Sequence, residues 1–206
     1  APLLRAADAE ARYYAALCAC EGVHSALLEP LLERLFDDDA QIRLLVRDVL
    51  PHYRRLPAFE PVAERLCAQA LAAEAPLRSR LAAIDAISVL RDAASVPTLI
   101  ELSADADKQI SVPALRALTA ITCQDFAKAT KKWRAWYESN AYRHRVEWLI
   151  DGLMHSDQNL RASAGLELQK LTQVYYGYVA AASKRERELA QKRYWDWWRT
   201  EGRKKF

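Results

Sequence analysis

The chain repeats a short pattern at a distance of 50 residues, and this repetition limits the folds open to it. Residues 121–127 read Ile-Thr-Cys-Gln-Asp-Phe-Ala, and residues 171–177 read Leu-Thr-Gln-Val-Tyr-Tyr-Gly. Repetition on this scale is typical of stacked units that bury their apolar faces against one another. Aromatic residues at helical spacing follow both copies: Trp133, Trp136 and Tyr137 after the first, and Tyr194, Trp197 and Trp198 after the second.

The residue content favours helices throughout. Glycine is scarce, with 5 residues, and all 8 prolines lie at or before Pro113. Apolar residues recur at helical spacing in blocks separated by short polar breaks, which predicts an all-α fold. We expect a kink or a late helix start at Pro113. The predicted helices cover residues 3–20, 25–36, 40–55, 59–73, 76–91, 95–104, 108–122, 130–139, 143–155, 158–172 and 183–201.

Three of the breaks share one signal. Asp39, Asp107 and Asp157 each stand three residues before the first apolar residue of a predicted helix. An aspartate there accepts a hydrogen bond from a backbone N–H that the helix leaves unpaired, so each is a predicted N-cap. Ser183 and Glu186 form a predicted capping box for the last helix. The helices also share a stripe of one small and two large residues: Ala83, Ile87 and Leu90; Ala114, Leu118 and Ile121; Ala164, Leu168 and Leu171.

The paired helices, the aspartate breaks and the alanine-led stripe resemble HEAT repeats. The resemblance is most specific over residues 108–202, in the turn at 171–177, the aromatic helix after Trp133 and the run 145–155. There it resembles a subtype common in bacterial HEAT-repeat proteins, although Ala127 stands where that subtype usually has glycine. The family implies an α-α superhelix of antiparallel helix pairs and protein binding. It therefore predicts one solenoid domain over residues 1–206, with generic repeats in 1–107 and aromatic, basic repeats in 108–206.

Charge divides the chain into two unlike parts. Residues 1–107 hold 11 Lys and Arg against 17 Asp and Glu, whereas residues 108–206 hold 19 against 10 and all 6 tryptophans. A solvated basic face and an anionic partner both explain such an excess. We expect a protein partner with an acidic surface; a nucleic acid gripped by basic and aromatic side chains is the alternative. The candidate partner-binding residues are Lys131, Lys132, Arg134, Arg143, Arg145, Lys192, Arg193 and Trp195.

Among the tryptophans, Trp195 is expected to stand apart. The aromatic residues at helical spacing form stripes that are typical of a buried core. Trp195 lies off that stripe, so we predict that it is partly exposed and serves as an anchor for a partner.

The sequence gives little sign of catalysis. Glu147, Asp151 and His155 are spaced for one helix face, but no cysteine or second histidine joins them, so we predict no metal and no cofactor. The chain is predicted to be a non-enzymatic binding scaffold. The alternative is a repair protein resembling the HEAT-like DNA glycosylases, for which Asp125 and Asp196 are the acidic candidates near aromatic residues.

The cysteines indicate the cellular compartment in which the protein works. Cys18, Cys20, Cys67 and Cys123 match neither a disulfide framework nor a zinc site, which predicts reduced thiols in a cytoplasmic protein. No uncharged apolar run approaches the roughly 20 residues of a membrane span. Because the chain begins Ala-Pro-Leu-Leu-Arg without methionine, we expect it to be either a part of a longer protein or a chain trimmed at its start.

Overall fold

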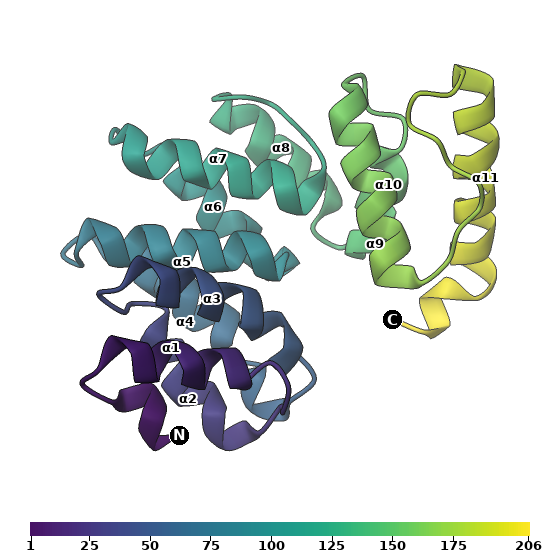
Figure 1. Cartoon of the computed structure of the whole chain (residues 1–206). Coiled ribbons are helices and arrows are strands. Elements are labelled where there is room, and N and C mark those ends of the chain that lie inside the picture. Colours follow the sequence, from purple (N-terminus) through teal and green to yellow (C-terminus); the bar gives the residue numbers. More distant parts are fainter. The chain divides into compact units, whose positions relative to one another are not determined.

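The computed structural model describes all 206 residues of the chain, and its regular structure is helical without a strand. This confirms the predicted all-α class. No helix is both long and apolar enough to cross a membrane. The chain forms eleven α-helices, which are labelled in Figure 1: α1 (Ala9–Cys18), α2 (Ser25–Arg34), α3 (Ala40–Val49), α4 (Val62–Leu71), α5 (Leu77–Leu90), α6 (Val96–Leu102), α7 (Lys108–Thr122), α8 (Thr130–Asn140), α9 (Arg145–Gly152), α10 (Gln158–Thr172) and α11 (Lys184–Thr200).

Two compact units make up the chain, one from Ala1 to Ala117 and the other from Leu118 to Phe206. The division falls inside α7. In the first unit α1 and α2 both pack on α3, and α3 and α4 both pack on α5. In the second unit α9 packs on α10 and α11. A link as short as residues 72–76 allows α4 and α5 to lie side by side only in opposite directions.

Each of the eleven predicted helices is present, and the first differs most from its prediction. The single helix expected over 3–20 is divided into the 3-10 turn η1 (Pro2–Arg5) and α1. The division lies at Asp8, whose carboxylate accepts a hydrogen bond from the backbone N–H of Ala11 at 2.9 Å and so begins a new helix. A capping side chain there satisfies a donor that a continuous helix would pair with its own backbone.

Proline has different effects in α3 and α7. The helix predicted over 40–55 ends at Val49 and continues as the 3-10 turn η2 (Leu50–Tyr53), in which Pro51 lacks the N–H that α-helical pairing requires. Pro113, in contrast, lies inside α7, which nevertheless begins at Lys108. The late start that we considered for α7 therefore does not occur.

The predicted caps are confirmed at all three aspartate breaks, and the predicted capping box of α11 is present. The carboxylate in each case accepts a hydrogen bond from the backbone N–H two residues later. The distances are 2.7 Å from Asp39 to Gln41, 2.8 Å from Asp107 to Gln109 and 2.8 Å from Asp157 to Asn159.

An arginine completes the break in three of four places. It stands four residues after the capping aspartate, and one of its guanidinium nitrogens donates to two backbone carbonyls just before the cap. The fourth break has Ser111 at this position, and its hydroxyl donates to the Asp107 carbonyl at 3.1 Å. The three arginines and the carbonyls that they hold are Arg12 with Ala6 and Ala7, Arg43 with Asp37 and Asp38, and Arg161 with His155 and Ser156.

The two copies of the repeated turn share a backbone conformation. Cys123 and Gln173 both adopt positive φ, at 52° and 58°, where the preceding helix ends. Four residues later Ala127 and Gly177 do the same, at 48° and 73°. The alanine therefore accepts the left-handed conformation that glycine adopts freely, and the carboxylate of Asp125 fixes it by accepting from the Ala127 N–H at 2.7 Å.

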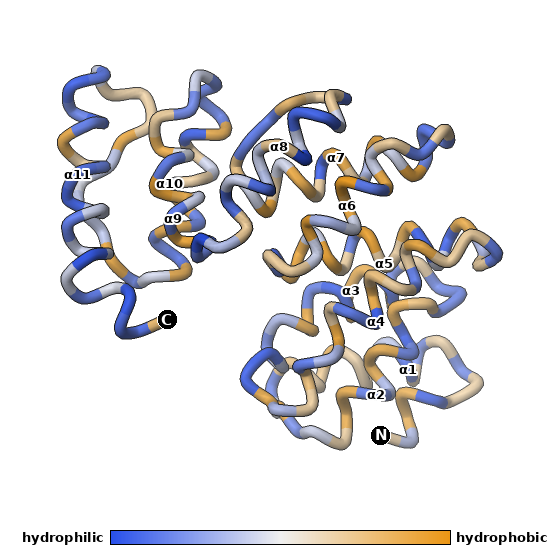
Figure 2. The backbone as a smooth tube through the Cα atoms, turned by 180° about the vertical axis from the view of Figure 1, so that it is seen from behind, coloured by the Kyte–Doolittle hydropathy of each residue, from blue (hydrophilic) through white to orange (hydrophobic).

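The predicted apolar stripes form the interior of each unit. All of their residues are buried except Leu171, which is half-buried. Figure 2 shows the corresponding alternation of apolar and polar positions along the helices. In the second unit Tyr194, Trp197 and Trp198 join one buried cluster with residues of α9 and α10, which confirms the core position predicted for these aromatic residues.

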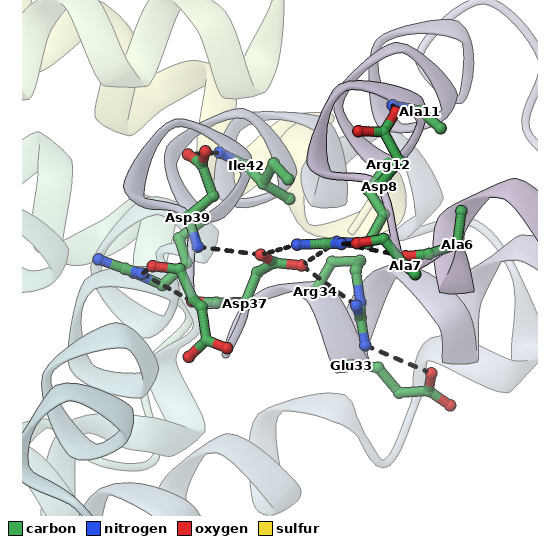
Figure 3. Close-up of polar contacts among 12 residues, drawn as sticks. Ala6, Ala7, Asp8, Ala11, Arg12, Glu33, Arg34, Asp37, Asp39 and Ile42 are labelled. Carbon is green, nitrogen blue, oxygen red and sulfur yellow. Dashed lines mark hydrogen bonds and ion pairs between the residues drawn. The ribbon is translucent and has the colours of Figure 1, made fainter.

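A buried carboxylate lies among the arginines of the first unit (Figure 3). Asp37 follows α2, and its side chain is 1% exposed. It accepts two hydrogen bonds from Arg12, at 2.8 and 2.9 Å, one from Arg34 at 3.1 Å and one from the backbone N–H of Asp39 at 3.0 Å. Burial alone would raise the pKa of Asp37, but these bonds lower it below its ordinary value.

Candidate functional site

A second buried carboxylate organises the surface of the second unit. Glu147 lies in the first turn of α9, and its Oε1 accepts a hydrogen bond from the indole N–H of Trp198 at 2.8 Å. Arg203 donates to the same oxygen at 3.2 Å, and Arg143 donates to Oε2 at 3.0 Å. Burial would raise the pKa of Glu147, but these three donors lower it. The carboxylate therefore stays ionised and joins α9 to α11.

Local features of the sequence bring these elements together. His144 caps α9 by accepting from the Val146 N–H at 3.3 Å, and the capping box at Ser183 starts α11. Gly202 lets the chain turn back after α11: a Cβ there would lie 2.5 Å from Cε3 of Trp198, closer than side chains tolerate. Arg203 follows this glycine and reaches Glu147 because the turn is tight.

Arg143 connects the carboxylate to an aromatic surface. Its guanidinium also binds Asp151 at 2.8 Å and Asn140 at 2.7 Å. The same guanidinium lies 5.7 Å from the ring centroid of Trp195, and that of Arg199 lies at the same distance. Both are within the range of cation–π attraction. Trp195 is half-buried, as predicted. It lies on α11 together with Arg199, and Arg143 comes from the segment just before α9.

A hollow of about 430 Å³ lies beside this array. His144 stacks on Trp198, with ring centroids 5.2 Å apart and planes 21° apart, and Phe206 lies 5.5 Å from His144. Desolvation of the imidazole lowers the pKa of His144, which keeps the ring neutral at neutral pH. Tyr142, with 84% of its surface exposed, stands at the rim. The hollow thus offers aromatic faces beside guanidinium donors.

The predicted binding residues lie on different helices. Arg143 and Trp195 come together, as described above. Lys131, Lys132 and Arg134 are exposed on α8, whereas Lys192 and Arg193 are exposed on α11.

Arg145 occupies a different place from the other candidates. Its side chain is buried, donates to the carbonyl of Ile121 at 3.0 Å and pairs with Glu167 at 3.0 Å. It therefore holds α9 against α10 and the end of α7 from the inside. We exclude it from the candidate surface for this reason.

The remaining acidic candidates have ordinary structural contacts. Asp125 caps the repeated turn, and Asp196 pairs with Arg199 at 3.7 Å. Glu147 and Asp151 both form ion pairs with Arg143. The spacing of these two acids along one helix face therefore serves salt bridges to Arg143. No group of three His, Cys, Asp or Glu residues is placed to hold a metal ion.

Sequence reasoning missed Arg199, Arg203, Tyr142 and Phe206 as parts of this surface. The spacing of Arg143, Glu147 and Asp151 could have indicated the ion pairs. Nothing local indicates the indole contact of Glu147, which joins residues 51 apart in sequence. Neither a family model nor a curated protein matches this chain.

Proposed function

We propose that the chain is a non-enzymatic, cytoplasmic binding module, a HEAT-type α-α superhelix that docks a protein partner with an acidic surface. The observation that carries the proposal is the half-buried Trp195 with Arg143 and Arg199 at its ring. Tryptophan and arginine dominate the energetically important positions of protein interfaces. Glu147 fixes Arg143 in advance, so a partner's carboxylate would meet an ordered guanidinium and lose less entropy on binding.

The exposed cations supply the attraction for an acidic partner. The side chains of Arg199 and Arg203 are 64% and 60% exposed, and Lys192 and Arg193 stand on the same helix as Arg199. Each guanidinium has donors left over, because one carboxylate uses at most two of its five N–H groups. A partner carboxylate can therefore bind without breaking the contacts that hold the surface.

The test is capture of partners by variants of the full chain. Arg199→Glu reverses a charge beside Trp195, and Arg185→Glu makes the same change in the first turn of α11. We expect quantitative mass spectrometry to find a protein partner that is retained by the wild type and by Arg185→Glu and lost with Arg199→Glu. Equal recovery by both variants would refute the role of this surface.

The exposed Tyr142 beside Arg143 favours one alternative, a nucleic acid with bases stacked on aromatic rings. Fluorescence anisotropy with a labelled single strand and a labelled duplex tests it. Binding to phosphates should weaken by orders of magnitude between about 50 and about 200 mM salt. Tight binding that persists at the higher salt would make nucleic acid the preferred partner.

A further inference from the structure

A groove in the first unit carries an inference that does not depend on the surface of the second unit. It has a volume of about 630 Å³, within the range of about 300–1,000 Å³ typical of ligand pockets. Helix α5 supplies half of its lining residues, α3 supplies further residues, and α7 contributes Pro113 and Arg116. All of the lining residues belong to the unit Ala1–Ala117.

The groove has an aliphatic lining. Leu44 of α3 is 43% exposed, and Leu77 and Leu81 of α5 are half-buried. Pro113 adds an apolar ring from α7. Covering an exposed leucine with another aliphatic side chain removes apolar surface from water and is therefore favourable. No aromatic side chain lines the groove, so it lacks the stacking platform that single-stranded nucleic acids use.

The charge of the groove is opposite to that of its unit. Residues 1–117 contain 13 Lys and Arg against 17 Asp and Glu. The groove lining nevertheless contains four arginines, Arg43, Arg47, Arg78 and Arg116, and one acid, Asp85. A local basic lining in an acidic unit selects for an anionic ligand and repels cationic ones.

The arginines differ in how they are already bound. Arg43 holds backbone carbonyls, whereas Arg47 bridges Asp48 and Asp85, and Arg78 pairs with Asp38. The acids in these pairs are exposed, and exposed pairs contribute little, so a ligand carboxylate can replace them. Arg116 is exposed on α7 and has no ion pair.

We propose that this groove binds an acidic, leucine-containing segment of a partner protein, with aliphatic side chains over Leu44 and Leu81 and carboxylates at Arg116 and Arg78. The aliphatic lining, the four arginines and the lack of aromatic residues together favour this ligand over a nucleic acid. Docking of an amphipathic segment in a groove is an established mode of peptide recognition.

The probes are three labelled peptides of equal length. The first consists of glutamates and serines with two leucines four positions apart, the second has serines in place of the leucines, and the third has lysines in place of the glutamates. Anisotropy with the full chain should show binding of the first peptide alone. Arg116→Glu should weaken it about tenfold, as expected for reversal of a charge at an interface, and Leu44→Ser should also weaken it. Arg55→Glu, on an exposed arginine outside the groove, should leave it unchanged.

Several outcomes would overturn the inference. These are the absence of binding to the first peptide, equal binding of the lysine peptide, or equal affinity of Arg116→Glu and Arg55→Glu. Sedimentation that shows a dimer dissociated by Arg116→Glu would assign the groove to self-association instead. If Arg199→Glu abolished peptide binding and Arg116→Glu did not, the peptide would bind the second unit, and the proposed function would stand while this inference failed.

Discussion

Asp37 and Glu147 are both buried carboxylates between two arginines, but their surroundings differ. The arginines of Asp37 are largely enclosed, with Arg12 12% and Arg34 22% exposed, and its fourth hydrogen bond comes from a backbone N–H. Glu147 binds one enclosed arginine and one that is 60% exposed, and its remaining donor is an indole. The first cluster fixes a helix break, whereas the second fixes a surface and presents guanidinium groups on it.

The comparison shows that one arrangement of charges has two uses. In an enclosed cluster each charge depends on its partner, because water does not replace it. In an open cluster water solvates part of the charge when a partner is removed. The enclosed cluster should therefore matter more for folding and the open cluster more for binding.

Asp37→Ala should have the largest effect on stability. It removes the only carboxylate that pairs with Arg12 and leaves two arginines near each other in a buried site. We expect a loss of about 3 to 5 kcal/mol in the free energy of unfolding, measured by urea denaturation. Asp38→Ala is the matched control, because Asp38 is exposed, and it should cost less than about 0.5 kcal/mol. Similar losses for both variants would contradict the enclosed character of the cluster.

Glu147→Gln should cost less, about 1 to 3 kcal/mol by the same measurement. The amide oxygen can still accept from the Trp198 indole, and Arg143 keeps Asp151 as a partner. Removal of the charge should free Arg203, which is already largely solvated. Glu138→Gln, an exposed position on α8, is the control. A loss larger than that of Asp37→Ala would show that the second cluster is the more enclosed one.

The pH dependence of stability provides a third test, with a smaller effect. The folded-state pKa of Asp37 and that of Glu147 are lowered, so the unfolded chain takes up these protons first as the pH falls. The stabilisation is therefore present above the ordinary carboxylate pKa of about 4 and is lost as the pH falls below it. Asp37→Asn should flatten the decline in melting temperature between about pH 5 and pH 3, and an unchanged slope would contradict the assignment.

Signals within one helix predicted much of this fold. Asp39, Asp107 and Asp157 identified helix starts because a cap acts on the next turn of the same chain. The apolar stripes identified the core for the same reason. The Asp-x3-Arg spacing at Arg12, Arg43 and Arg161 was visible in the sequence but was not recognised.

The candidate surface was harder to predict because its contacts are distant in sequence. The burial of Arg145 depends on Ile121 and Glu167, which come from two other helices. Trp195 was predicted correctly as partly exposed, because one helix determines which way it faces. Its neighbour Arg199 is four residues later on the same helix and could have been predicted, whereas Arg143 required the packing of α9 on α11.

Trp195→Ala should have the smallest effect on stability, because Trp195 lies at the exposed edge of the cluster around Glu147. The ring is half-buried, and the side chain of Arg199 that contacts it is 64% exposed, so we expect a loss of about 1 kcal/mol or less by urea denaturation. Leu189→Ala, at an exposed position on the same helix, is the control and should be close to neutral. If Trp195→Ala cost as much as Asp37→Ala, the ring would belong to the core and the proposed surface would lose its anchor. If the loss is small while partner capture falls, Trp195 serves binding and Glu147 serves to place Arg143 beside it.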